Sequence, residues 1–535
     1  MRLAIPRILN LCFVAAMAVS LAYSGDSGEA GRLLLQAQHS FEEGDWAGAE
    51  AAAQKARAVD PQLADAYVLL GLIAGRQQRV ADAEGLFRKA ARLEPDNYRT
   101  LNYLASTCLQ LGRADEAAGI FGQVLRMAPA NQAAHYNLGL IQLTKGRTAE
   151  AKRHFDAVRL ANARDVPARI GALESDLILK DREAARRVAL ELDRLLPAGD
   201  ADRLRAAALL GSYGAYAEVV TLLEKMPANL PEAREASFDM ALALFHLGEF
   251  NRAAVTLQPS LAQPSNVEAL SLLGDIEDAR GNADAALAAY RKATEAEPAN
   301  ENFWFSYGSF LLRQDRGADA NAVFARGSDH ATHSARLRLG QGVALYSSGL
   351  YEQAADCLLR LAADEPAVSL TYYFLGELYE AVPSAQDRVA RVLGSYLAAE
   401  PKDPLAYREY GRILFLRAQS QVESDYGPAK KSLKTALALD PRYAEAYLQL
   451  AVIAQSENNP RESVPLLRKA LALKSSLSTA HYRLALAYRK LGMTAQASQE
   501  MDQYSREKND EAAASRRDLL RTLGTSVRTV SPRVP

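Results

Sequence analysis

Cysteine is scarce in this sequence, with three cysteines among 535 residues. Cys12 lies in an N-terminal stretch that we expect to be removed. Cys108 and Cys357 fall in sequence repeats, described below, that lie seven units apart. This separation far exceeds the roughly 7 Å between the Cα atoms of a bridged pair. The sequence therefore excludes a disulfide scaffold and predicts that both cysteines are buried packing residues.

The chain also lacks an excess of either positive or negative charge. The chain has 63 lysine and arginine residues against 64 aspartate and glutamate residues, a formal net charge of −1. A nucleic-acid-binding protein usually carries a basic excess on one face or segment. No such excess is present, so we predict no nucleic-acid partner.

Catalytic motifs are absent as well: there is no phosphate loop, HExxH, GxSxG or dinucleotide fingerprint. The nearest approach to a metal pair is His330 with His333, which we interpret as part of a solvated loop. Asp275, Glu277 and Asp278 form an acidic cluster. Paired carboxylates cleave glycosidic bonds when they face each other across about 5–9 Å, but on one helix we expect surface charge. We predict no enzyme activity, metal or cofactor.

Only one long apolar run occurs, Ile8–Tyr23, and two arginines precede it. It is short for a membrane span of about 20 residues. Ala22 and Ser24 are small residues at the spacing that signal peptidase recognises. We therefore predict that residues 1–24 are a signal peptide, that the mature chain has no transmembrane segment, and that the protein is periplasmic or secreted. An uncleaved anchor is the alternative.

The rest of the chain follows a repeat of mostly 34 residues, which Ala64–Pro95 illustrates. This unit predicts two short amphipathic helices joined by a polar turn, with Pro95 ending the second. Counting from Ala64, the eighth position of each unit holds Ala37, Gly71, Ala105, Gly139, Leu173, Ala207, Ala241, Gly274, Gly308, Gly342, Gly376, Gly411, Ala451 and Ala485. All but Leu173 are small. Such residues let two helices cross closely, and a larger side chain there would force the backbones apart.

The unit resembles the tetratricopeptide repeat at Tyr67, Leu70, Gly71, Ala74, Ala83, Phe87, Ala90 and Pro95. The resemblance covers about residues 30–509 and implies an all-α, right-handed superhelical solenoid of about fourteen helix-turn-helix repeats. Residues 510–520 would form a capping helix and 521–535 a disordered tail. Leu173 and Val219 depart from the pattern and predict distorted fifth and sixth repeats. Six extra residues in the twelfth repeat predict a longer turn.

The resemblance also implies that positions 2, 5, 9 and 12 of each first helix line a groove. We predict a partner-binding groove formed by Tyr136, Leu140, Phe238, Leu242, Phe245, Phe305, Tyr346 and Tyr373. The same positions include Val68, Leu72, Leu143, Leu312, Leu339, Val343 and Phe415. These apolar residues have two interpretations. Coiling of the solenoid buries them against neighbouring repeats, or they bind an apolar segment of a partner.

A candidate anion pocket consists of Arg408, Arg412, Gln449, Arg483 and Arg489. It resembles the clamp by which some tetratricopeptide domains hold a C-terminal carboxylate, although that clamp uses lysine and asparagine where Arg408, Arg412 and Gln449 stand. Arginine forks match carboxylates well. The alternative is a solvated basic face balanced by Glu445.

These observations favour a non-catalytic scaffold of the cell envelope that binds protein or peptide segments. The alternative is a carbohydrate- or exopolysaccharide-binding or export-assembly factor. That function would use Tyr136, Phe238, Tyr346 and Tyr373 as stacking platforms, with amide and carboxylate groups beside them. The many leucines in the predicted groove favour peptide.

Overall fold

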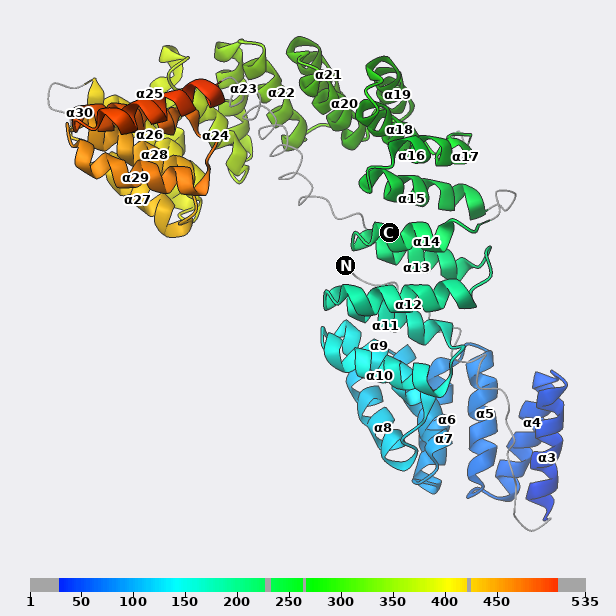
Figure 1. The fold of residues 1–535 in the computed structure, drawn as a ribbon. Helices are drawn as coiled ribbons and strands as arrows, with labels where there is room; N and C mark the ends of the chain where they lie inside the picture. The colour runs from blue at the N-terminus through cyan, green and yellow to red at the C-terminus, as the bar shows by residue number, and fades with distance from the viewer. Residues whose placement is uncertain (1–27, 227–231, 263–265, 421–424, 509–535) are drawn as a thin grey trace. The chain divides into compact units, whose positions relative to one another are not determined.

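The computed structural model describes residues 28–226, 232–262, 266–420 and 425–508, and these residues form helices with no strand. Fourteen consecutive helix pairs confirm the predicted all-α solenoid. The chain divides into two units, Met1–Ser260 and Leu261–Pro535, and within each unit every helix packs against its neighbours along the chain (Figure 1). The predicted signal peptide, capping helix and tail lie outside the described residues.

The helices of the first unit make up seven pairs. They are α3 (Glu29–Glu42), α4 (Trp46–Val59), α5 (Ala64–Arg76), α6 (Val80–Leu93), α7 (Tyr98–Gln110), α8 (Ala114–Met127), α9 (Gln132–Thr144), α10 (Thr148–Ala161), α11 (Val166–Ile178), α12 (Arg182–Leu195), α13 (Ala201–Ser212), α14 (Tyr216–Leu223), α15 (Glu232–His246) and α16 (Phe250–Thr256). The short α17 (Gln258–Leu261) follows them.

The second unit continues the same alternation. Its helices are α18 (Val267–Ala279), α19 (Ala283–Ala296), α20 (Glu301–Arg313), α21 (Gly317–His330), α22 (Ala335–Ser347), α23 (Tyr351–Asp364), α24 (Ser369–Leu378), α25 (Gln386–Ala399), α26 (Pro404–Gln419), α27 (Gly427–Leu439), α28 (Ala444–Ser456), α29 (Pro460–Leu473) and α30 (Ser478–Lys490). A 3-10 turn, Pro383–Ala385, precedes α25, and residues 494–508 are helical. No helix in the described parts of the chain is long and apolar enough to cross a membrane.

The turn inside each repeat explains where the first helix ends. In the fourth repeat Gly146 has a φ of 72°, a left-handed conformation that stops the helix without steric cost. Asparagine or aspartate side chains often start the following first helix. Asn131, for example, accepts a hydrogen bond of 2.9 Å from the backbone N–H of Ala134. Local sequence chemistry therefore sets the helix boundaries.

In several repeats the glycine at position 8 lies against an aromatic ring of the second helix, whereas Gly342 and Gly411 lie against Leu358 and Leu433. A Cβ atom added at Gly139 would lie 2.7 Å from the Phe155 ring. The same ring also lies against Gly171 of the next repeat, where an added Cβ would again be 2.7 Å away. One phenylalanine therefore joins two repeats, and this is why the sequence keeps small residues at these positions.

Replacing Gly139 by leucine should destabilise the fourth repeat by about 1–3 kcal/mol, because the added side chain would have to displace the buried Phe155. Urea denaturation followed by circular dichroism measures the loss, and hydrogen exchange locates it. Gly119→Leu is the matched control, since a Cβ at Gly119 meets nothing within 4 Å. An equal loss in both variants would contradict the close-crossing explanation.

The fifth repeat keeps ordinary helix lengths although Leu173 is large. Leu173 is buried in the same apolar cluster as Ala185 and Ala189 of the second helix, and small residues on that helix can offset the larger volume of Leu173. The irregular helices are instead α14, with 8 residues, and α16, with 7. The expected distortion is therefore present in the sixth repeat, continues in the seventh, and does not affect the helix lengths of the fifth.

In the twelfth repeat, the extra residues partly lengthen the first helix. This helix, α26, has 16 residues, whereas most first helices have 13. Residues 421–424 lie outside the described parts of the chain. The extra sequence therefore does not simply enlarge the turn, as we had expected.

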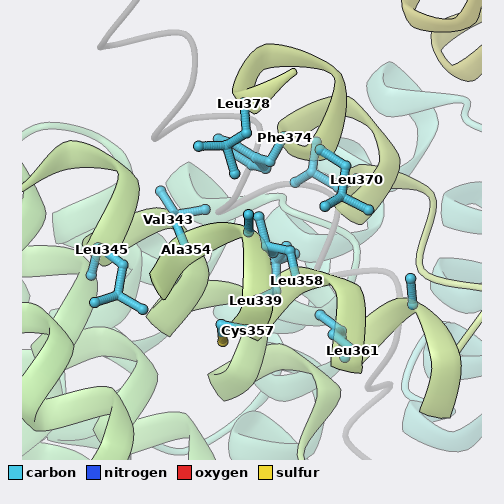
Figure 2. Close-up of a cluster of buried hydrophobic side chains, with 14 of the residues drawn as sticks. Leu339, Val343, Leu345, Ala354, Cys357, Leu358, Leu361, Leu370, Phe374 and Leu378 are labelled. Carbon is cyan, nitrogen blue, oxygen red and sulfur yellow. The ribbon is translucent and has the colours of Figure 1, made fainter. Parts of the chain in front are cut away.

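The second unit has a continuous apolar core. Figure 2 shows Leu339, Leu358 and Phe374, which come from three successive helices, gathered in one cluster. Cys357 lies in the same cluster, and both Cys108 and Cys357 are free and buried. The predicted role of these cysteines as packing residues is confirmed.

Candidate functional site

The apolar side chains predicted to line the groove fall into two classes. We call positions 2, 5, 9 and 12 of the first helices the A-face. Seven of its predicted apolar residues are buried by neighbouring repeats, namely Val68, Leu72, Phe305, Leu312, Leu339, Val343 and Phe415. Eight remain partly exposed, namely Tyr136, Leu140, Leu143, Phe238, Leu242, Phe245, Tyr346 and Tyr373. The burial interpretation is therefore confirmed for part of the A-face, and the binding of a partner segment by the exposed part stays a prediction.

Of the eight residues predicted to form the partner-binding groove, Phe305 is buried and the other seven are partly exposed. The guanidinium carbon of Arg336 lies 3.8 Å from the centroid of the Phe305 ring, a cation–π contact. Arg336 Nη1 also donates a hydrogen bond of 2.7 Å to Asn302 Oδ1. A side chain of the following repeat thus covers Phe305, which is 4% exposed.

In the first unit, the partly exposed residues of the predicted groove lie on α9 and α15. Tyr136 meets Phe155 edge to face, with ring centroids 5.9 Å apart, and Leu140 packs beside it. On α15, Phe245 lies 5.7 Å from Phe250, measured between ring centroids. These side chains are anchored by the repeat core on one side and partly exposed on the other. They can contact a ligand without rearrangement.

In the second unit, Arg408 and Arg412 lie together on α26, as their spacing predicts. Arg408 Nη1 lies 2.7 Å from Glu409 Oε1 and 3.5 Å from Glu377 Oε1. Arg412 Nη1 lies 2.8 Å from Glu380 Oε1, and its Nε donates to Glu409 Oε2 over 3.3 Å. Two arginines therefore face three glutamates of the same chain.

This ionic cluster corrects the predicted anion pocket. An incoming carboxylate would have to displace glutamates that already neutralise both arginines, and Arg408 is 8% exposed. Arg483 and Arg489 belong to α30 and Gln449 to α28. The structure joins Arg408 and Arg412 with glutamates rather than with the other three predicted residues, because the acidic partners come from α24, from the turn that follows it and from α26 itself.

Glu409 is the centre of this cluster, and its side chain is fully buried. Burial raises the pKa of its carboxyl to about 7, while Arg408 and Arg412 act in the opposite direction. Gly376 provides the space, since a Cβ there would lie 2.5 Å from Glu409 Oε2. Tyr443 lies against the cluster, and its hydroxyl oxygen accepts a hydrogen bond of 3.2 Å from Arg408 Nε. Burial raises the pKa of Tyr443 to about 12.

The acidic cluster of the eighth repeat is internally paired rather than simply solvated. Tyr290 donates a hydrogen bond of 2.7 Å to Asp275 Oδ1. Glu277 pairs with Arg280 at 2.6 Å, and Asp278 with Arg313 at 2.8 Å. The Asp275 and Asp278 carboxylates join α18 to α19 and α20, whereas the Glu277 pair lies at the end of α18 itself. The three carboxylates do not face each other across a substrate site.

The histidines that contact other side chains include His330 and a pair in the fourth repeat, His135 and His154. The imidazole of His330 stacks on Trp304, with ring centroids 5.8 Å apart. The described residues contain no group of three or more side chains able to hold a metal ion. A histidine pair that sequence reasoning missed joins the two helices of the fourth repeat, where the Nδ1 atoms of His135 and His154 lie 3.0 Å apart. The sequence does contain both histidines, at positions 4 and 23 of that repeat.

Acidification should weaken the fourth repeat through this pair. Burial and the nearby His135 lower the pKa of His154 from its usual 6.5. The unfolded chain therefore takes up the proton first, so the stabilisation is complete above pH 6.5 and decreases as the pH falls towards the lower native pKa. Hydrogen exchange of α9 and α10 between about pH 7 and about pH 5.5 measures the change. His154→Gln should flatten this dependence, whereas the exposed control His39→Gln should retain it.

Comparison with known families decides the identity of the repeats. Four models, each described as a tetratricopeptide repeat, match residues 34–98, 109–177, 258–301, 271–331, 444–476 and 479–507. Together they span just over half of the chain. The chain belongs to the tetratricopeptide repeat family. Family membership makes it a repeat scaffold for protein–protein interaction.

Relatives of this tetratricopeptide repeat chain share limited sequence identity with it. A TPR repeat-containing protein of Bacillus subtilis, YpiA, is 23% identical over 337 residues, which cover 57% of this chain and 78% of YpiA. Among solved structures, Cut9 in the APC/C hetero-tetramer Cut9–Hcn1 is 16% identical, with 93% of this chain and 96% of that chain covered and a TM-score of 0.35. Yeast Tom70 is 13% identical, with 87% and 96% covered and a TM-score of 0.39.

Proposed function

We propose that the chain is a non-catalytic scaffold of the cell envelope that holds segments of partner proteins on its A-face. The observation that carries this proposal is the pair of partly exposed apolar rows on α9 and α15. Each row has three large side chains one turn apart, Tyr136, Leu140 and Leu143 on α9 and Phe238, Leu242 and Phe245 on α15. Such apolar surface on a soluble helical repeat is typical of a peptide- or helix-binding face.

The composition of the rows favours a polypeptide ligand over a carbohydrate. Leucines stand beside the aromatic residues in both rows. Sugar binding relies on aromatic faces flanked by amide and carboxylate groups, whereas an apolar peptide face can be largely aliphatic. The leucines have no hydrogen-bonding group to offer a hydroxyl-rich ligand.

Site-specific photo-crosslinking tests the proposal. A benzophenone amino acid replaces Phe238 on the A-face or, as the control, Val255 on α16 of the same unit, which is 74% exposed. We expect discrete protein adducts in the native host from position 238 and none from position 255. Equal adducts from both positions, or none from position 238, would contradict binding on the A-face.

The proposed location depends on the N-terminal segment. We expect the mature protein to begin near Gly25, because Ala22 and Ser24 match the residues that signal peptidase requires. N-terminal sequencing of protein from the envelope fraction measures this directly. A chain that still begins at Met1 or Arg2 would contradict the predicted export.

A further inference from the structure

From α9 to α15, positions 5, 9 and 12 of the A-face hold a single charged residue. Positions 5, 9 and 12 of α9, α11, α13 and α15 hold Tyr136, Leu140, Leu143, Ile170, Glu174, Leu177, Leu204, Ala208, Gly211, Phe238, Leu242 and Phe245. Glu174 occupies position 9 of α11, and neighbouring first helices contact each other in the order α9, α11, α13, α15. A segment that crosses from the α9 row to the α15 row would therefore pass Glu174.

The Glu174 carboxylate has no partner of its own. Its side chain is partly buried, and among the described residues none forms a hydrogen bond or ion pair with it. Burial raises its pKa, and the charge of Arg205 only partly opposes this. Arg205 is itself 4.0 Å from Asp202 Oδ1, so these three groups carry a net charge of −1 when ionised.

Two A-face carboxylates of the second unit are paired with cations of the same chain. Glu377, at position 9 of α24, lies 3.5 Å from Arg408 Nη1. Glu445, at position 2 of α28, accepts a hydrogen bond of 2.9 Å from Lys474 Nζ. A partly buried carboxylate without such a cation costs free energy in the native state. Glu174 lacks such a cation, as does Asp65 at position 2 of α5, whose pKa burial also raises. Of these two carboxylates, only Glu174 lies on a helix between α9 and α15.

We propose that the A-face of the first unit binds an apolar partner segment carrying one lysine or arginine, and that Glu174 receives this cation. This inference deepens the proposed function and rests on it. The α9 and α15 rows hold the apolar side chains of the segment. Ala208 and Gly211, at positions 9 and 12 of the neighbouring helix α13, are both small.

Binding would make Glu174 selective because it removes the remaining water from the carboxylate. A lysine or arginine replaces that water with a charge-assisted hydrogen bond. A neutral residue would leave the carboxylate buried and unpaired, and an acidic residue would add repulsion. Glu174 thus disfavours segments that have a neutral or acidic residue at this point, while the apolar rows supply most of the contact.

Synthetic peptides of leucine, phenylalanine and alanine, twelve residues long, provide the probe. Each carries lysine, norleucine or glutamate at its centre, and fluorescence anisotropy measures binding to the full chain. We expect the lysine peptide to bind about tenfold more tightly than the glutamate peptide. Glu174→Gln should abolish this preference and Glu174→Lys should reverse it. Glu183→Lys, an exposed position on α12 of the same repeat, is the matched control and should keep the preference.

The outcomes separate this inference from the proposed function. If Phe238→Ala weakens every peptide but the lysine preference survives Glu174→Gln, the A-face binds peptides and the role of Glu174 is overturned. A wild-type preference for norleucine or glutamate overturns it as well. If none of the peptides binds at about millimolar concentration, the inference fails, and position 238 crosslinking then decides the proposed function separately. Circular dichroism checks that each variant is folded.

Discussion

Replacing Arg203 by methionine should lower the free energy of unfolding of the sixth repeat and its neighbours by about 3–5 kcal/mol. Arg203 is 2% exposed, and its guanidinium forms an ion pair of 2.7 Å with Asp193. It also donates to four backbone carbonyl groups, those of Pro197, Leu222, Asp193 and Leu196. The substitution leaves these acceptors without donors in a site that excludes water.

Urea denaturation measures this effect, and hydrogen exchange should locate it in α12, α13 and α14. Arg203→Lys should lose most of the same free energy, because one ammonium group cannot reach five acceptors in the fixed geometry of a guanidinium. Arg205→Met is the matched control on the same helix. Its side chain is 49% exposed, so we expect a change within about 1 kcal/mol. Equal losses at Arg203 and Arg205 would contradict the buried role of Arg203.

Replacing Glu409 by alanine should destabilise the twelfth repeat by about 3–5 kcal/mol, because Arg408 would stay buried without its closest carboxylate. The Glu409 side chain is 0% exposed and that of Arg408 is 10% exposed, so water cannot substitute for the lost partner. Thermal and urea denaturation of the full chain measure the loss. The control, Glu380→Ala, removes an outer partner of Arg412 that is 60% exposed. We expect that control to cost at most about 1 kcal/mol.

This result also bears on the predicted anion pocket. Changing Arg408 and Arg412 together to alanine would leave Glu377 and Glu409 without the cations that neutralise them. The double substitution should therefore unfold part of the second unit before any effect on binding could be measured. If the double variant instead keeps wild-type stability and loses partner affinity, the arginines bind the partner and the internal pairing is unimportant.

The repeat pattern in the sequence was sufficient to predict the fold. Small residues at position 8, such as Gly139, and aromatic residues on the second helix, such as Phe155, specify how one helix crosses the next. Left-handed glycines and asparagine caps mark the helix ends. Each of these features acts over a few residues or within one pair, so a single repeat already contains the information.

The candidate site could be predicted only in part. The periodicity placed Phe305 and Phe238 at equivalent positions, yet Arg336 of the next repeat covers Phe305. The sequence indicated that Arg408 and Arg412 share a helical face, but not that Glu377 of the preceding repeat neutralises them. Neither contact follows from helical periodicity, because each joins side chains about one repeat apart.

The sequence by itself thus determined the helices, the boundaries between them and the repeat family, since these depend on local periodicity and on close packing within each repeat. The tertiary structure alone decided which A-face residues are exposed and which charges are paired. It showed that Arg203 is held by five acceptors and that Glu174 is left without a partner on the A-face. Exposure and ion pairing depend on long side chains that reach across from other helices, and helical periodicity does not specify where those side chains lie.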